Sequence, residues 1–96
     1  MQPHCGIINT ARGGLIDDKA LATALHENRV GFAALDAFQQ EPLPQDSVLR
    51  SAPRTILTPH SAAFTDSANR QMGCQVVRDV VAVLRGNQPE HEITAP

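Results

Sequence analysis

The sequence predicts an α/β fold in which about three parallel strands are joined by crossover helices. Short apolar runs occur at residues 5–9, 30–36 and 55–58, and each has the length of a strand. Helical patterns follow the first and third runs, at residues 17–28 and 65–85. This alternation is typical of parallel strands with right-handed crossovers, and three such strands make half of a doubly wound sheet.

The first run, residues 5–9, precedes a glycine-bearing turn and suits a strand that is buried on both faces. In the helix that follows, Asp17 can cap the free backbone N–H groups, while Ile16 and Leu21 can form a hydrophobic staple. Asn28 tolerates the left-handed conformation that ends a helix. Local signals therefore predict both ends of the first crossover helix.

Residues 37–53 break the pattern. Pro42, Pro44 and Pro53 each lack a backbone donor and disfavour helix in the residue before them. We expect a long loop without structure of its own, and such loops in compact domains are often functional.

The third strand is stopped by Pro59, and the last helix can be capped by Thr65, run to about Arg85 and end at Gly86. Its apolar side chains recur at helical spacing. They are Met72, Val76, Val80, Val83 and Leu84. Residues 87–96 have the composition of a polar tail.

Composition excludes several classes of function. The sequence has 8 Lys and Arg residues and 10 Asp and Glu residues, so it lacks the basic stripe that nucleic-acid binding requires. Cys5 and Cys74 lie far apart without metal-ligand spacing, which argues against a zinc site or a disulfide and fits reduced thiols in a cytoplasm. The longest apolar stretch, residues 80–84, is far below the roughly 18 residues of a membrane span, and no leader opens the chain. We expect a soluble cytoplasmic protein with no metal, membrane or nucleic-acid partner.

Polar residues follow each predicted strand. Thr10, Ala11 and Arg12 follow the first strand, Asp36 ends the second, and His60 follows the third. Because ligands bind beyond the carboxyl ends of parallel strands, these residues are expected to converge on one binding edge.

Three residues near this edge carry chemistry. The planar fork of Arg12 suits a carboxylate, although a surface salt bridge explains such an arginine equally well. His60 can exchange a proton near neutral pH, although a loop histidine is often a solvated bystander. Glu41 by itself is an exposed loop carboxylate, and nothing in the spacing pairs it with His60.

Three sequence motifs taken together are more specific than any one of them. Residues 8–17, 33–42 and 56–60 resemble, in order and spacing, the signature series of the D-isomer-specific 2-hydroxyacid dehydrogenases, and the resemblance extends from residue 3 to about residue 89. It implies a Rossmann-type NAD-binding domain, of which residues 1–96 would form the C-terminal part. The activity implied is the interconversion of a small 2-keto acid and a D-2-hydroxy acid with NAD or NADP.

The resemblance also implies roles. Arg12 would hold the substrate carboxylate and polarise its C2 oxygen, and His60 would exchange a proton with that oxygen as hydride moves between C2 and the nicotinamide ring. Glu41 would pair with His60 and favour the imidazolium. Asp36 would accept a hydrogen bond from the nicotinamide carboxamide. Arg12 and His60 would also lie beside the ring, whose backbone lining would come from Thr10, Ala11, Ser61, Ala62 and Ala63.

The sequence departs from the family pattern in several places. We find neither G-x-G-x-x-G nor an acidic residue about 20 positions after it, and the Gly13-Gly14 pair is a different motif. The substrate domain is also missing, and Ser61 to Phe64 replace a segment that commonly bears glycine. We therefore expect a fragment that by itself neither binds NAD or NADP tightly nor catalyses.

Two alternatives remain open. The same fold serves transcriptional corepressors that sense the dinucleotide, so a non-catalytic interaction module would carry the same three motifs. A half-domain could also be stabilised by pairing with another copy, because the strand at residues 5–9 would expose an apolar edge. On this reasoning the chain is expected to form a homo-oligomer such as a dimer.

Overall fold

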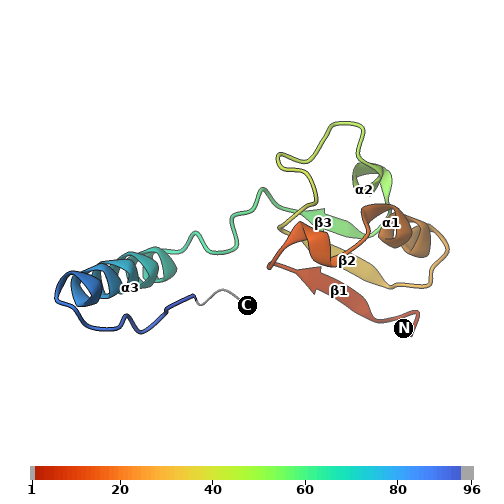
Figure 1. Cartoon of the computed structure of the whole chain (residues 1–96). Coiled ribbons are helices and arrows are strands. Elements are labelled where there is room, and N and C mark those ends of the chain that lie inside the picture. Colours follow the sequence, from red (N-terminus) through yellow and green to blue (C-terminus); the bar gives the residue numbers. More distant parts are fainter. Residues whose placement is uncertain (1, 94–96) are drawn as a thin grey trace. The chain divides into compact units, whose positions relative to one another are not determined.

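The computed structural model describes residues 2–93 and contains two compact units, which divide between Ala62 and Ala63. The first unit holds a three-stranded sheet in the order β1-β2-β3, with both pairs of strands parallel (Figure 1). The strands are β1, Gly6–Asn9; β2, Phe32–Leu35; and β3, Thr55–Leu57. The predicted α/β class with three parallel strands is therefore confirmed.

The register brings the carboxyl ends of the strands to one edge. Asn9 of β1 lies opposite Leu35 of β2, and Leu35 lies opposite Leu57 of β3. The segments that leave the three strands consequently begin side by side. This alignment is what allows residues distant in sequence to form one site.

Helix α1, Asp18–His26, connects β1 to β2 after a short 3-10 helix, η1, at Gly13–Leu15. The carboxylate of Asp17 caps α1 by accepting a hydrogen bond from the Ala20 N–H at 2.9 Å. Asn28 has φ 56°, so the chain leaves the helix through the left-handed conformation. The predicted cap at Asp17 and the predicted exit at Asn28 are confirmed.

The long connection between β2 and β3 differs from the prediction. It includes α2, Val48–Ser51, which begins where the Ser47 hydroxyl accepts a hydrogen bond from the Leu49 N–H. Leu49 is fully buried, so this single turn anchors the loop to the core. The expectation of a loop without structure of its own is therefore wrong, because one capped turn with one buried leucine is stable there.

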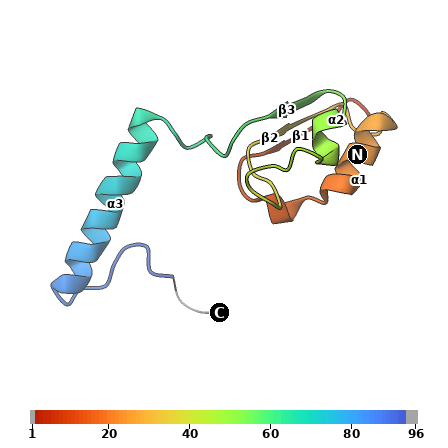
Figure 2. The same ribbon diagram turned by 90° about the horizontal axis from the view of Figure 1, so that it is seen from above.

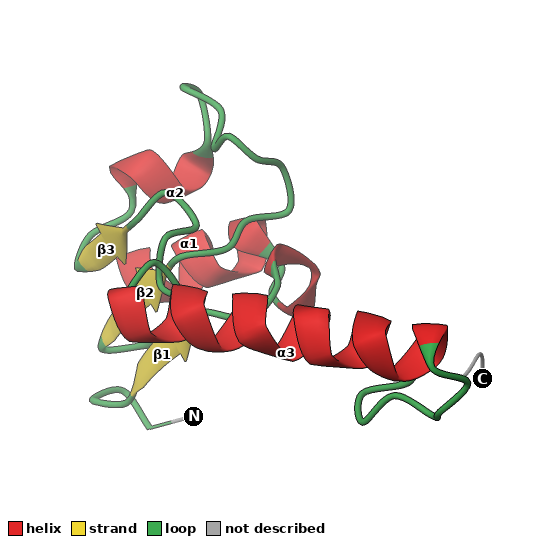
Figure 3. Ribbon diagram, turned by 90° about the vertical axis from the view of Figure 1, so that its left-hand side faces the viewer, coloured by secondary structure: helices red, strands yellow, loops and turns green. Residues whose placement is uncertain are grey.

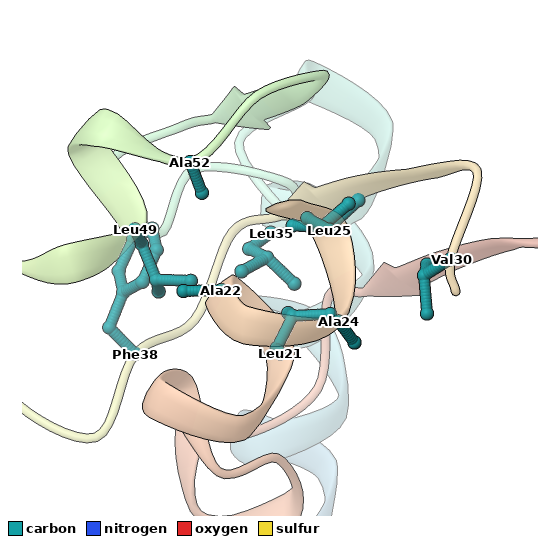
Figure 4. Close-up of a cluster of buried hydrophobic side chains, with 10 residues drawn as sticks. Leu21, Ala22, Ala24, Leu25, Val30, Leu35, Phe38, Leu49 and Ala52 are labelled. Atoms are coloured by element: carbon teal, nitrogen blue, oxygen red, sulfur yellow. The ribbon is translucent and has the colours of Figure 1, made fainter. Parts of the chain in front are cut away.

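Helices α1 and α2 lie on the same side of the sheet (Figure 2) and enclose the core of this unit, which Figure 4 shows in close-up. The largest fully buried side chains are Leu25 of α1 and Leu49 of α2. Ala33 and Leu35 of β2 face them. Partly buried side chains, among them Ile16, pack around this cluster.

The opposite side of the sheet is uncovered in the unit as described. Ile8, Ala34 and Ile56 share one row across the three strands, and the exposed fractions of Ile8 and Ile56 are 70% and 64%. The expectation that the first strand is buried on both faces is therefore not met within this unit, because both of its α-helices cover the same face. β1 is also an edge strand, as expected.

The second unit contains α3, Asp66–Leu84, a single uninterrupted helix (Figure 3). The Thr65 hydroxyl caps it at the Ala68 N–H, and Gly86, at φ 75°, closes it. None of its residues is buried, and its apolar stripe is exposed. Within residues 2–93, no helix is long and apolar enough to cross a membrane. The last part of the expected polar tail, residues 94–96, lies outside the described residues.

Candidate active site

The loop after β1 is fixed by a buried asparagine. Asn9 is 6% exposed, and its side-chain amide donates to the Arg12 carbonyl at 2.8 Å while its side-chain carbonyl accepts from the Ala11 N–H at 3.1 Å. These two bonds close the turn that presents Arg12. Sequence reasoning missed Asn9, although an amide residue that ends an apolar strand is a usable signal for such a turn.

Arg12 itself is exposed, and its guanidinium donates to the carbonyl of Ala11 at 2.6 Å. The next residue, Gly13, is buried against the backbone of Phe38. A Cβ on Gly13 would lie 1.8 Å from the Phe38 carbonyl carbon, a distance that no side chain permits. Gly13 therefore lets the loop after β1 lie directly against the loop after β2.

Asp36, directly after β2, organises the loop after β3. Asp36 is almost fully buried, with an exposed fraction of 3%. Its Oδ1 accepts from the Thr58 hydroxyl and from the Ser61 N–H at 2.9 Å, and its Oδ2 accepts from the Ala62 N–H at 2.8 Å. The carboxylate thus holds the chain on both sides of His60. Thr58 is a second residue that sequence reasoning missed.

The pKa of Asp36 lies below its usual value. The hydrogen bond from the Thr58 hydroxyl has the largest effect, burial opposes it, and the N–H groups of Ala62 and Ser61 lower the pKa further. Asp36 is therefore ionised at neutral pH, as an acceptor of three hydrogen bonds should be.

We expect Asp36→Asn to lower the free energy of unfolding at neutral pH, because the new NH₂ group would face the donors that the carboxylate accepts from. Since folding lowers the pKa of Asp36, its stabilising contribution is present above the unfolded value of about 3.9 and is lost as the pH falls through the folded value. Urea unfolding of both chains at several pH values measures this. A difference between the chains that stays equally large in strong acid would contradict the assignment.

His60 has an unusual backbone conformation. Its φ is 53°, in the left-handed region that residues with a Cβ seldom adopt. The turn is held by the His60 N–H, which donates to the Thr58 carbonyl at 3.0 Å, and by the Asp36 bonds described above. Such local strain persists where the surroundings fix it, and it is common at functional sites.

Glu41 contacts His60. Its Oε2 lies 2.7 Å from Nδ1 of His60, and its Oε1 accepts from the Phe38 N–H at 3.0 Å. The Phe38 N–H has the largest effect in lowering the pKa of Glu41, and the hydrogen bond with His60 lowers it further. Because an ionised carboxylate only accepts, Nδ1 of His60 carries the proton of this bond and Nε2 is left to face a ligand. The pairing that the family resemblance implied is thus present in the geometry.

Glu41 and His60 share an open pocket of about 580 Å³. Most of its lining is apolar, so the two ionisable side chains stand against a hydrophobic wall. The lining residues are Phe38, Glu41, Pro42, Leu43, Arg50, Leu57, Thr58, Pro59 and His60. Arg12 and Asp36 are not among the described residues that line it. The structure therefore brings Glu41 and His60 together and ties Asp36 to the His60 loop, while Arg12 stands on the separate loop after β1.

Residues 1–62 match the family model described as D-isomer specific 2-hydroxyacid dehydrogenase, NAD binding domain. The chain belongs to this family. Its members are NAD(P)-dependent dehydrogenases, and the matched residues include the three strands and every predicted site residue except Ala63. The family resemblance read from the three sequence motifs is therefore confirmed.

Relatives within the dehydrogenase family are close. The D-3-phosphoglycerate dehydrogenase of Methanocaldococcus jannaschii is 43% identical over 96 residues, which are 100% of this chain and 18% of that protein. The D-lactate dehydrogenase of Lactobacillus jensenii, solved with NAD⁺, has a TM-score of 0.80 at 32% identity, covering 99% of this chain and 32% of that chain. A dehydrogenase of the family from Xanthobacter autotrophicus, solved with NADPH, has a TM-score of 0.82 at 30% identity, covering 98% of this chain and 38% of that chain. The chain thus spans between about a fifth and two fifths of these dehydrogenases.

The polar groups at this edge are chemically suited to a nicotinamide dinucleotide, the family's cofactor. A carboxylate offers about four acceptor positions, and the hydrogen bonds to Asp36 described above use three of them. The residues Thr10 and Ala11 are exposed beside it. In the part of the chain that the structure describes, no group of three or more His, Cys, Asp or Glu side chains could hold a metal ion.

Proposed function

We propose that this chain supplies the proton-exchanging and substrate-orienting side chains of an enzyme that interconverts a 2-keto acid and a D-2-hydroxy acid. The observation that carries the proposal is the contact between Glu41 and His60, held in place by the Asp36 bonds on either side of His60. A loop histidine without a function needs neither a carboxylate partner nor a strained backbone. The arrangement matches a general acid whose ring orientation is fixed by a second group.

The proton transfer falls to His60. With Nδ1 engaged by Glu41, Nε2 of the imidazolium can donate to the C2 oxygen of a keto acid during reduction. In the oxidation direction the neutral ring takes the proton back. The ionised Glu41 accepts the hydrogen bond from Nδ1 and so fixes the orientation of the ring. The dinucleotide, when bound, supplies or accepts the hydride.

Arg12 would orient the substrate. Its exposed guanidinium stands on a turn that Asn9 fixes, and it can hold a carboxylate by two parallel hydrogen bonds. The nicotinamide ring would lie along Thr10, Ala11 and Ala62, with its carboxamide donating to Asp36. In this arrangement the binding groups would come from the loops that follow the three strands.

The three motifs are shared with the non-catalytic corepressors, so turnover is the property that separates an enzyme from such a module. The test is a chimera in which this chain replaces the matching 96 residues of the M. jannaschii phosphoglycerate dehydrogenase, assayed with that enzyme's own substrate and product. Turnover by the chimera is expected. A folded chimera that binds dinucleotide without turnover would contradict the proposal.

In this chimera we expect Glu41→Gln to move the pH profile of keto acid reduction. Glutamine keeps the size of the side chain and removes the negative charge that favours the imidazolium, so the alkaline limb of the profile should fall at a lower pH. Rates of cofactor oxidation measured across the pH range check this. Glu27→Gln, which alters an exposed carboxylate paired with Arg29, is the matched control and should leave the profile unchanged. An identical profile for Glu41→Gln and the parent would mean that the two side chains do not cooperate in turnover.

A further inference from the structure

We infer that Arg50 is a positioning residue for the proposed dehydrogenase reaction: it fixes the loop that carries Glu41 and thereby the contact of Glu41 with His60. The inference rests on the proposed function for its importance in turnover. The contacts that support it lie wholly within the first unit.

The loop around Glu41 is short of hydrogen-bond donors. Pro42 and Pro44 have no N–H, so this stretch cannot secure itself by backbone bonds in the usual way. The carbonyls of Leu43 and Pro44 both receive a bond from one guanidinium: Nε of Arg50 donates to Pro44 at 2.8 Å, and Nη2 donates to Leu43 at 2.8 Å. One side chain thus supplies two of the donors that the prolines remove.

Arg50 is itself well anchored. It lies on α2 next to Leu49, which is fully buried, and its backbone N–H donates to the Ser47 carbonyl at 3.0 Å. The guanidinium therefore extends from a turn that is fixed to the core. Its two hydrogen bonds therefore hold the loop in a fixed position relative to α2.

Glu41 is held from both directions along the chain. Upstream, the Phe38 N–H donates to its carboxylate, and downstream the Arg50 fork secures the residues just after Pro42. Arg50 also lines the pocket that Glu41 and His60 share. Without the fork, the Leu43 carbonyl loses this donor and the Pro44 carbonyl keeps only the Ser47 N–H at 3.2 Å. The downstream side of the loop is then held less firmly, and so is the approach of the carboxylate to the ring. A lysine cannot replace the fork, because its ammonium is a single donor centre.

The test uses the whole 96-residue chain and two variants, Arg50→Met and Arg50→Lys, with Arg29→Met as the control for losing an exposed arginine. Nuclear magnetic resonance gives two readouts. These are the hydrogen-exchange rate of the Phe38 amide and the carbon-detected titration of the Glu41 carboxyl group. In Arg50→Met we expect the Phe38 amide to exchange roughly tenfold faster, as for loss of one ordinary hydrogen bond, and the pKa of Glu41 to rise towards its usual value. Arg50→Lys should change both readouts in the same direction but less, and Arg29→Met should change neither.

Both readouts unchanged in a folded Arg50→Met chain would overturn the inference. If Arg50→Met does not fold, the Arg50→Lys variant decides. Parent-like values of both readouts in Arg50→Lys would show that the charge matters rather than the fork, and would also overturn the inference. Failure of the proposed function looks different. The two resonance readouts would still respond to Arg50, while Glu41→Gln in the chimera would leave the pH profile unchanged.

Discussion

Replacing His60 with glutamine is expected to lower kcat for keto acid reduction by about 10²- to 10⁴-fold, the range that a positioned general acid contributes. Glutamine is similar in size and its amide can still donate to Glu41, so the loop geometry should survive. What it cannot do is give up a proton to the C2 oxygen. The loss should therefore appear in kcat, with little change in the affinity for the cofactor.

The measurement is the rate of cofactor oxidation in the chimera described above. His26→Gln is the matched control, because His26 is an exposed histidine in the last turn of α1, away from the pocket. It should keep the parent rate. Normal kcat in His60→Gln would remove His60 from the reaction.

Arg12→Ala is expected to lower kcat/KM for the keto acid by at least about 100-fold, since loss of an orienting contact lets the reacting atoms leave the productive geometry. Part of the loss should appear as a higher KM, because a carboxylate loses its charged partner. Arg12→Lys should recover some binding but little of kcat, because a point charge attracts the carboxylate without aligning it.

Steady-state kinetics with varied keto acid separates these effects. Arg29→Ala, which removes an exposed arginine paired with Glu27, serves as the control and should leave both constants as in the parent. A parent-like KM and kcat in Arg12→Ala would show that substrate orientation belongs to another residue.

Much of the fold follows from local chemistry in the sequence. Caps at Asp17 and Thr65 and left-handed exits at Asn28 and Gly86 depend only on a few neighbouring residues, and all four are confirmed. The helix α2 escaped prediction because four residues are too few to show a periodic pattern. Its remaining signals are a serine cap and a leucine, and they stabilise a helical turn only when the leucine packs into a core.

Part of the candidate site could be predicted from the sequence in the same way. The convergence of strand ends follows from parallel topology, so the placement of Asp36 and His60 near one another needed no knowledge of a family. The pairing of Glu41 with His60 did need it, because the two residues lie 19 positions apart and this spacing carries no geometric information. The roles of Asn9 and Thr58 depend on hydrogen bonds between loops, which neither spacing nor composition reveals.

The parallel order of the strands also bears on how the chain assembles during synthesis. Gly6 pairs with Phe32 and Ala33 pairs with Thr55, so each ladder must close a long stretch of chain before its contacts form. The hydrogen bonds of α1 join near neighbours, whereas pairing between distant strands is slow. The last strand, β3, ends three positions before His60, so the placement of His60 depends on the pairing of β3 with β2. The apolar row across the three strands is therefore complete only when β3 has paired with β2.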